Sequence, residues 1–319
     1  MVTMKTLLLN RYISILLKLI VFVIIFMVIY ITIPLNVPTK RVKLPKGSIT
    51  NTINALKNQG FNVSFIDKYL LVLMGAPKSG EILIDKPRIN RIDFLKKIID
   101  AKGEFYRVTL IPGETKEIFF KNLEKKYGLD YQKLLSNYLE FSPYKEAGIL
   151  PDTYHVPVGI DEKSLIKFLI EQSEKKYKKL ALSELKRYNR DEWNIYLIVA
   201  SIVQKESANI EEMPKVASVI YNRLKKGMFL QMDATLNYGI YSHTIITSDR
   251  IKKDNSPFNT YKNRGLPPYP ISSVSIEAIK SAIYPAKTDF LFFVKNKNGT
   301  HDFSKTYKEH LKNIQRAKR

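Results

Sequence analysis

The longest apolar stretch of the chain lies near its N-terminus. Residues 19–39 contain no charged side chain and are dominated by Ile, Val, Leu and Phe. About 20 such residues are needed for a helix to cross a bilayer. A cleaved signal peptide would have a shorter apolar centre and a small-residue cleavage site, and neither is visible before Pro34. The pattern predicts that residues 1–39 form a short cytoplasmic tail and an uncleaved transmembrane anchor.

Shorter apolar runs, separated by turn residues, follow the anchor. They predict a small α+β module over residues 40–107. Residues 108–115 (VTLIPGET) are similar to residues 42–48 (VKLPKGS), and both predict a strand, a Pro/Gly turn and a hydroxyl residue that caps a helix. The similarity indicates an imperfect internal repeat, whose second copy begins a segment covering residues 108–160.

Helical periodicity dominates the remainder, residues 161–319. An amphipathic helix is predicted over 165–188, a buried one from 193 to about 206, and a third with Pro214 in its first turn and Gly227 past its end. Residues 275–283 predict another helix, 290–294 a short buried strand, and the polar segment from Lys305 a solvated helix. The expected fold class is α+β, with a membrane anchor, one or two small modules and a mixed α+β C-terminal domain.

The buried helix ends in a carboxylate, Glu206, followed by Ser207. Glu206 lies one and two turns after Ile202 and Val199, on a face that we expect to be dry. Desolvation and the negative end of the helix dipole both raise the pKa of such a carboxyl group. A carboxyl that keeps its proton near neutrality can act as a general acid. The alternative is a solvated glutamate in a last helical turn.

Composition and the absence of common motifs limit the kinds of partner and reaction that the chain can have. The net charge of +22 favours anionic partners, but Lys is spread along the chain without the compact Arg and aromatic stripe of a nucleic-acid site. A Lys-rich solvated surface is the alternative. The chain has no cysteine, and its four histidines form no HExxH pattern. GxSxG, Walker and dinucleotide-binding motifs are absent from the sequence. No metal, cofactor or nucleic-acid partner is implied.

A polar cluster follows Glu206. Amides, hydroxyls and aromatic rings of this kind hold sugars, although each residue alone could have a structural role. The members are Tyr221, Asn222, Arg223, Gln231, Asp233, Thr235, Asn259 and Tyr261.

Several motifs occur in a recognisable order. They are residues 151–154 (PDTY), 200–207 (ASIVQKES), 219–224 (VIYNRL), 227–235 (GMFLQMDAT), 256–261 (SPFNTY), 265–268 (GLPP), 290–294 (FLFFV) and 299–304 (GTHDFS), followed by His310. In order and spacing the chain resembles the YceG-like endolytic murein transglycosylases of the MltG type. Residues 108–135 resemble a LysM module, a family that binds glycans containing N-acetylglucosamine. An ordinary α+β appendage is the alternative for this segment.

The resemblance implies an activity and roles for residues. Such enzymes cleave bonds between N-acetylmuramic acid and N-acetylglucosamine inside peptidoglycan strands, leave 1,6-anhydro ends, and are thought to terminate strands made by membrane-bound synthases. Glu206 corresponds to the catalytic acid, on a helix as in lysozyme-like sites. Gln231, Asp233, Asn259 and Tyr261 are the candidates for positioning substrate, with Ser207 and Thr235 in support. No protein nucleophile is required, because the muramyl C6 hydroxyl attacks C1.

The chain departs from the family pattern at several positions, which puts loop shape and subsite preference in doubt. They are Ala147 and Gly148, Gln204, Ala234, Tyr269, and residues 273–275.

Two other classes of function remain open. One is a cell-wall-binding scaffold without enzymatic activity that uses the LysM-like segment. The other is a hydrolase that uses Glu206 and Asp233 as a carboxylate pair. Basic residues flank the anchor on both sides, so charge does not fix its orientation. A large domain that follows a short tail is usually translocated, and we expect the catalytic domain on the periplasmic, outer side of the cytoplasmic (inner) membrane.

Overall fold

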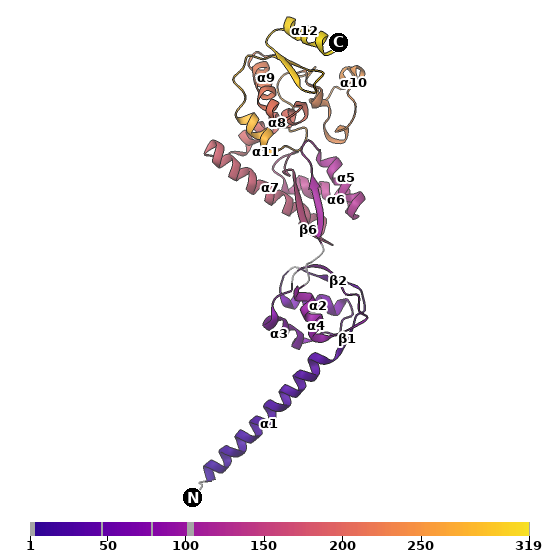
Figure 1. Cartoon of the computed structure of the whole chain (residues 1–319), viewed down its shortest axis with the longest axis vertical. Coiled ribbons are helices and arrows are strands. Elements are labelled where there is room, and N and C mark those ends of the chain that lie inside the picture. The colour runs from indigo at the N-terminus through magenta and orange to yellow at the C-terminus, as the bar shows by residue number, and fades with distance from the viewer. Residues whose placement is uncertain (1–3, 46, 78, 101–104, 319) are drawn as a thin grey trace. The chain divides into compact units, whose positions relative to one another are not determined.

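The fold is mixed α+β, and the chain forms two compact units. The computed structural model describes residues 4–45, 47–77, 79–100 and 105–318. Residues 1–106 with 155–160 make up the N-terminal unit, and residues 107–154 with 161–319 make up the C-terminal unit. Figure 1 labels many of their elements. Residues 1–3 of the predicted cytoplasmic tail lie outside the described residues, as do residues 46, 78 and 101–104 of the predicted 40–107 module.

The N-terminal unit begins with a long helix, α1 (Met4–Thr32). Its segment Arg11–Thr32 has 22 residues and a mean hydropathy of 2.9, long and apolar enough to cross a membrane. The predicted end at residue 39 is wrong, because Pro34 cannot continue the helix hydrogen bonds and instead begins β1 (Pro34–Asn36). Strand β1 pairs antiparallel with β4 (Arg88–Asn90), which places Leu35 in the core.

A strand, two helices and a strand follow in the same unit. They are β2 (Arg41–Leu44), α2 (Ile49–Asn58), α3 (Phe65–Met74) and β3 (Gly80–Leu83), with β2 antiparallel to β3. Helix α4 (Arg91–Asp100) packs against α3, β1 and β4. Apolar side chains from all of these elements meet in one core, including Val42, Leu56, Leu71, Ile82 and Phe94.

The same order of elements recurs at the start of the C-terminal unit. It comprises β5 (Phe105–Leu110), α5 (Lys116–Tyr127), α6 (Tyr131–Phe141) and β6 (Asp152–Pro157), and β5 pairs with β6. The internal repeat expected from the sequence therefore has a structural counterpart. The two N-cap residues differ: Ser48 accepts the Asn51 N–H, whereas Thr115 makes no side-chain cap. We call residues 107–154 the βααβ module.

Four helices enclose the largest core of the C-terminal unit. They are α7 (Glu162–Leu185), α8 (Arg190–Glu206), α9 (Met213–Lys225) and α11 (Ile276–Ile283), and they confirm the helices expected in this region. Trp193 of α8 and Ile220 of α9 are among the fully buried residues. Shorter elements connect them: η1 (Ile210–Glu212), η2 (Asp233–Leu236), η3 (Gly239–Tyr241) and α10 (Ser248–Lys253).

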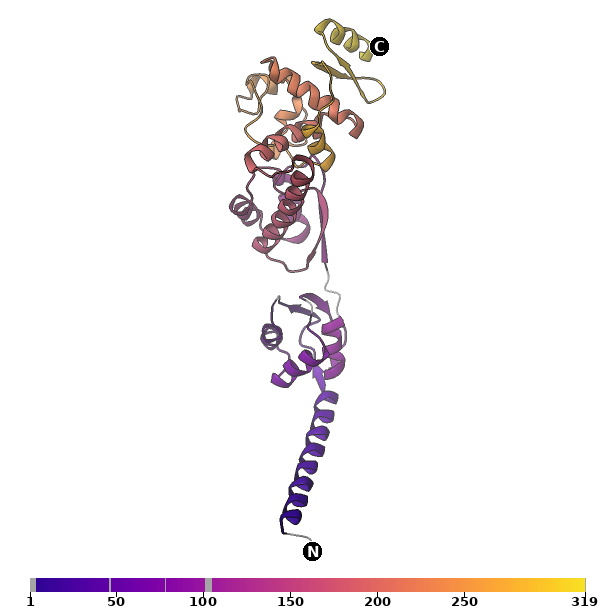
Figure 2. The same ribbon diagram turned by 90° about the vertical axis from the view of Figure 1, so that its left-hand side faces the viewer.

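The chain ends in a hairpin and a helix. Strand β7 (Phe292–Lys295) pairs antiparallel with β8 (His301–Ser304), and α12 (Tyr307–Lys318) lies beside them (Figure 2). The prediction of a buried strand at 290–294 is wrong about burial, because every residue from Phe290 to Val294 keeps some exposure. A two-stranded hairpin leaves one face open to solvent. Neither the length of segment 290–294 nor its aromatic residues predicts this exposure.

Candidate active site

Glu206 is the last residue of α8. The helix begins at Asn189, whose side chain accepts the Glu192 N–H at 3.0 Å, and its final turns bury Val199, Ile202 and Val203 completely. Ser207 follows in extended conformation and ends the helix. The apolar sequence of α8 thus fixes the backbone of Glu206 against the core, while its side chain leaves the helix at the C-terminal end.

A cavity of about 470 Å³ lies beside the Glu206 carboxyl group. Its wall combines polar groups from the segment around η2 with aromatic rings from the C-terminal hairpin and helix. Besides Glu206, the lining residues are Arg223, Leu230, Gln231, Met232, Asp233, Tyr261, Phe292, Phe293, Val294, Tyr307 and His310. All of them belong to the C-terminal unit.

The pKa of Glu206 is raised to about 7. The protein around the carboxyl group excludes water and so disfavours its charged form, which is the largest influence. The Ala234 N–H donates to Oε1 at 2.9 Å and acts in the opposite direction, while the negative charge of Asp233 adds to the rise. At neutral pH a substantial fraction of Glu206 therefore carries a proton, as a general acid requires.

Three of the predicted site residues share the cavity with Glu206: Gln231, Asp233 and Tyr261. The Tyr261 hydroxyl donates to Asp233 Oδ1 at 2.6 Å. Burial and this hydrogen bond raise the pKa of Tyr261, so its hydroxyl stays protonated. Gln231 is exposed to the cavity and has a positive φ of 51°, a conformation uncommon outside glycine.

The other three predicted residues do not line the cavity. Asn259 was expected to contact substrate, but its fully buried side chain donates to the Ile251 and Asp254 carbonyls at 2.8 and 2.7 Å. Its Oδ1 accepts the Tyr261 N–H, so it holds Tyr261 in place. Thr235 is also buried and donates to the Met232 carbonyl at 2.7 Å. Ser207 adjoins Glu206, and its Oγ has no partner among the described residues.

Arg223 organises the floor of the cavity. Its guanidinium donates to the carbonyls of Leu230 at 2.8 Å and Leu291 at 2.7 Å, and so joins the segment before η2 to the residue that precedes β7. The same group lies 5.1 Å from the centre of the Phe292 ring. Arg223 belonged to the polar cluster found in the sequence, but its spacing gave no sign of this bracing role.

The aromatic wall of the cavity was not predicted. Phe292 stacks on His310 with ring centres 5.2 Å apart, and Tyr307 lies 5.9 Å from Phe292. Burial and the nearby Arg223 lower the pKa of His310, which favours the neutral imidazole, and its Nδ1 has no partner within the described chain. The available signal was the order Phe292, Tyr307, His310 at the end of the matched motifs. The sequence predicts a buried strand around Phe292 and a solvated helix from Lys305, with no role for either in a cavity.

Nothing in the described ranges groups three or more His, Asp or Glu side chains in a way that could hold a metal ion.

These observations agree with the comparison to protein families. The model of the YceG-like family matches residues 42–316, which is most of the chain. The chain belongs to the YceG-like family. It is 38% identical over 170 residues to the endolytic murein transglycosylase of Bacillus subtilis, and 33% identical over 190 residues to that of Streptococcus pneumoniae.

The matched regions cover only part of each protein. They amount to 52% and 55% of this YceG-like chain, and to 46% and 34% of the Bacillus and Streptococcus relatives. The chain therefore spans less than half the length of these curated relatives. A crystal structure of a YceG-like protein from Listeria monocytogenes aligns with a TM-score of 0.57 and 26% identity, over 85% of this chain and 97% of that one.

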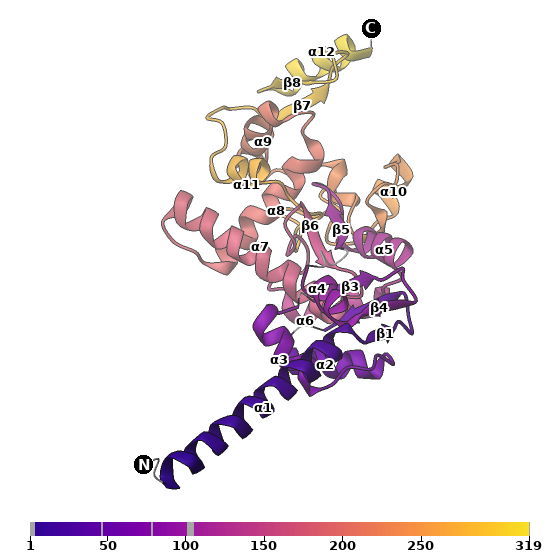
Figure 3. The same cartoon turned by 60° about the horizontal axis from the view of Figure 1, so that its bottom comes forward.

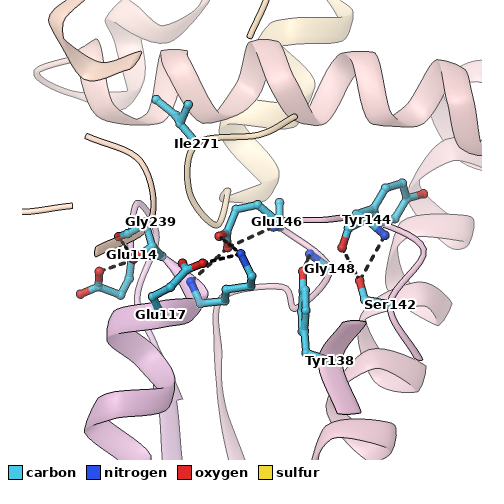
Figure 4. Close-up of polar contacts among 12 residues, drawn as sticks. Glu114, Glu117, Tyr138, Ser142, Tyr144, Glu146, Gly148, Gly239 and Ile271 are labelled. Carbon is cyan, nitrogen blue, oxygen red and sulfur yellow. Dashed lines mark hydrogen bonds and ion pairs between the residues drawn. The ribbon is translucent and has the colours of Figure 1, made fainter. Parts of the chain in front are cut away.

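Within the C-terminal unit of this YceG-like protein, the βααβ module is fixed to the region that bears Glu206. Figure 4 shows the polar contacts around the start of α5. Thr115 Oγ1 donates to the Gly239 carbonyl of η3 at 2.8 Å, and Glu114 Oε2 lies 3.0 Å from His243 Nε2. The Lys116 ammonium lies 2.6 Å from Glu117 and 3.2 Å from Glu146, and both pairs are largely buried.

Two of the segments that the sequence analysis singled out as departures contact each other. Gln204 Oε1 accepts the Ser275 N–H at 3.0 Å, just before α11 begins. Ser273 also exchanges backbone hydrogen bonds with Gly113 and Glu114 of the βααβ module, at 3.0 and 2.8 Å. Gln204 and residues 273–275 thus form one joint between the module and helices α8 and α11.

Proposed function

We propose that this YceG-like protein is an endolytic peptidoglycan transglycosylase. The observation that supports the proposal most directly is the Glu206 carboxyl, which has a pKa of about 7 and faces a cavity lined by hydroxyl, amide and aromatic groups. The two relatives named as endolytic murein transglycosylases support the same activity. The substrate would be the bond between N-acetylmuramic acid and N-acetylglucosamine within a strand.

The proposed reaction needs a single carboxyl group. Glu206 donates its proton to the glycosidic oxygen as the bond to C1 breaks. The muramyl C6 hydroxyl then attacks C1, and the Glu206 carboxylate accepts the C6 proton, so the carboxyl is regenerated and no water is consumed. Attack by a tethered hydroxyl profits from its high effective concentration. The product carries a 1,6-anhydro end and the chemistry uses no cofactor.

Other groups of the cavity would hold the sugar rings. The Asp233–Tyr261 pair and the Gln231 amide offer hydrogen bonds to hydroxyl and acetamido groups, and His310 Nδ1 is available as a further acceptor or donor. Phe292 and Tyr307 present aromatic surface to the same space. Asn259, Thr235 and Ser207 act indirectly, through the backbone around Tyr261, η2 and Glu206.

The remaining parts of the chain would keep the site near its substrate. The segment Arg11–Thr32 would anchor the protein in the cytoplasmic membrane with the catalytic domain outside, where peptidoglycan lies. The βααβ module would act as a LysM-like glycan contact. In that position the enzyme would terminate nascent strands beside membrane-bound synthases.

Product analysis tests the proposal. Purified glycan strands are digested with the protein in water labelled with heavy oxygen, and the new ends are weighed before and after borohydride treatment. Non-reducing, unlabelled anhydro ends are expected. Labelled, reducible ends would identify a hydrolase, and no new ends would favour a binding scaffold.

The variant Glu206→Gln tests whether the Glu206 carboxyl group is the acid. The amide is nearly isosteric and can still accept the Ala234 N–H, but it cannot donate a proton as an acid. We expect a loss of about 10² to 10⁴ in rate with unchanged folding. Activity within a few-fold of the parent protein would reject Glu206 as the acid.

A further inference from the structure

Helix α3 has an unusual surface. Phe65, Tyr69, Val72 and Leu73 are 70%, 62%, 58% and 83% exposed, and their spacing places them along one side of the helix. We call these four residues the α3 apolar face. The neighbouring α4 is ordinary by comparison, since it exposes Asp93, Lys96, Lys97 and Asp100. An exposed apolar patch of this kind marks a surface that contacts a partner or a membrane.

The start of α3 is joined to the end of α1. The Tyr30 hydroxyl, two residues before α1 ends, lies 2.6 Å from Ser64 Oγ and donates to Asp67 Oδ2 at 2.8 Å. Ser64 and Asp67 form the capping box of α3. The Arg91 guanidinium lies 4.2 Å from the centre of the Tyr30 ring and pairs with the buried Asp67 at 2.6 Å. These contacts fix α3 relative to the last turn of α1.

The contacts of Tyr30 with Ser64 and Asp67 determine the depth of α3 relative to a bilayer that α1 spans. A 22-residue span is about 33 Å long, which matches the hydrocarbon thickness of about 30 Å. Tyr30 then lies at the membrane–water interface, where tyrosine is favoured. Figures 1 and 3 show α3 beside the C-terminal end of α1, not further along the unit.

We propose that the α3 apolar face lies in the interfacial layer of the same bilayer that α1 spans, with Lys68 reaching toward the lipid headgroups. The inference rests on the proposed membrane anchor and adds a second point of attachment to it. The partner is the lipid surface, because the start of α3 is joined to the last turn of the span through Ser64 and Asp67, and a side-lying amphipathic helix buries such residues at the boundary of headgroups and acyl chains. Two attachments fix the tilt of the N-terminal unit on the membrane.

The test uses the full chain in phospholipid vesicles. The native sequence has no cysteine, so Leu73→Cys, Ile24→Cys and Lys179→Cys each give one site for an environment-sensitive fluorophore. Lipids with a spin label near the headgroup or deep in the acyl chain then quench the probe. We expect strong shallow quenching at Leu73, strong deep quenching at Ile24 in the span, and none at Lys179, which is exposed on α7.

Each failure has its own signature. Lipid quenching at Ile24 but not at Leu73 would overturn the inference and leave the anchor intact. No lipid quenching at Ile24 would overturn the anchor itself. A probe at Leu73 that is shielded from both lipid-borne and aqueous quenchers would be covered by protein, which also rejects a lipid contact.

A charge substitution provides an independent check. With the probe at Tyr69→Cys, the added change Val72→Glu should reduce shallow quenching at least twofold, because a carboxylate opposes insertion beside the probe. Val72 is exposed, so folding should be unaffected. The same charge placed at Lys97 of α4 is the control and should leave the quenching unchanged. The three proteins compared are Tyr69→Cys alone, Tyr69→Cys with Val72→Glu, and Tyr69→Cys with Lys97→Glu. Equal quenching of the probe in all three would contradict the proposal.

Discussion

The pKa of Glu206 is set by a balance between burial and Asp233, which raise it, and the Ala234 N–H, which lowers it. The proposed acid works only when protonated. With a pKa of about 7, kcat/KM should therefore be constant at acidic pH and fall about tenfold per pH unit above 7. A pH profile measured on defined strands checks this expectation. If kcat/KM instead began to fall near pH 4.5, along an alkaline limb of the profile that starts there, the pKa of Glu206 would be that of an ordinary glutamate.

Substitution of Ala234 should move that limb. In Ala234→Pro the backbone loses the N–H that favours the charged carboxylate, so the pKa of Glu206 should rise and the alkaline limb should shift to higher pH. Proline is tolerated in a first helical turn, and Ala234 is the second residue of η2. Ala234→Gly keeps the N–H and is the matched control. Asp233→Asn should shift the limb in the opposite direction, to lower pH.

Stability should respond to the same group. Since the folded pKa of Glu206 is about 7, above its ordinary value of 4.5, its protonation favours the folded state, and that contribution is lost as pH rises from 4.5 through 7. Glu206→Gln removes the penalty for a buried charge. We expect the variant to be more stable than the parent at pH 8, by roughly 1–3 kcal/mol, and similar at pH 4. Thermal unfolding at both pH values measures the difference. A destabilised variant at pH 8 would contradict a desolvated carboxyl.

At this scale the sequence predicted which polar residues meet around Glu206 better than it predicted the aromatic wall of the cavity. Glu206, Gln231, Asp233 and Tyr261 meet at one cavity, as the grouped motifs suggested. The burial of Asn259 could not be foreseen, because the spacing of a turn does not tell which of its amides points inward. His310 was missed because a polar helix gives no sign of the single face that it turns toward a cavity.

At the scale of elements, the sequence predicted the long helices and the strands β2, β5 and β7, but not strands such as β1, β4 and β6. Helices α7, α8, α9 and α11 have long apolar stripes and clear caps, so one sequence window contains the information that defines them. The end of the anchor was misplaced because residues 33–39 carry no charge, so composition alone does not separate them from the apolar run before them. Only their pairing with β4, distant in sequence, makes Leu35 a core residue of a folded unit.

Gly148 shows how closely the loop after α6 approaches that helix. A Cβ at this position would lie 2.1 Å from Ser142 Oγ and 2.7 Å from the Tyr138 hydroxyl, and Figure 4 shows the three residues together. Gly148→Ala should therefore destabilise the C-terminal unit by about 1–3 kcal/mol. In a double-mutant cycle with Ser142→Ala, the nearest clash disappears, and the combined loss in denaturant unfolding should be smaller than the sum of the single losses. Additive losses would mean that the loop moves away instead.

At the scale of the whole molecule, the chain uses one arrangement twice. Both βααβ segments contain strand, helix, helix and strand in the same order. The hydroxyl residue before the first helix makes a different contact in each segment. Ser48 caps α2, whereas the Thr115 hydroxyl is directed to the Gly239 carbonyl of η3. The second copy thus has a contact with the region that bears Glu206 in place of a local cap. Residues 107–154 belong to the same unit as Glu206, while the first copy belongs to the same unit as α1.

The division into units predicts how the chain tolerates truncation. Every residue that lines the cavity belongs to the C-terminal unit, so removal of the anchor should leave strand cleavage intact. The position of the cut matters for the N-terminal unit. A chain that begins at Ile33 keeps β1, whereas one that begins at Lys40 loses the three residues paired with β4 and the buried Leu35. Burial of one leucine side chain alone contributes about 1.5–3 kcal/mol.

We therefore expect the longer soluble chain to resist proteolysis within residues 40–100 and to unfold at higher denaturant concentration than the shorter one. Both chains should release anhydro ends from purified strands at the same rate, because neither cut reaches the C-terminal unit. Limited proteolysis followed by mass spectrometry locates the first cleavage sites, and product analysis gives the rate. Equal protease resistance would show that β1 adds nothing to its unit. If the two chains resist proteolysis differently and the shorter one also cleaves strands more slowly, the N-terminal unit takes part in the reaction.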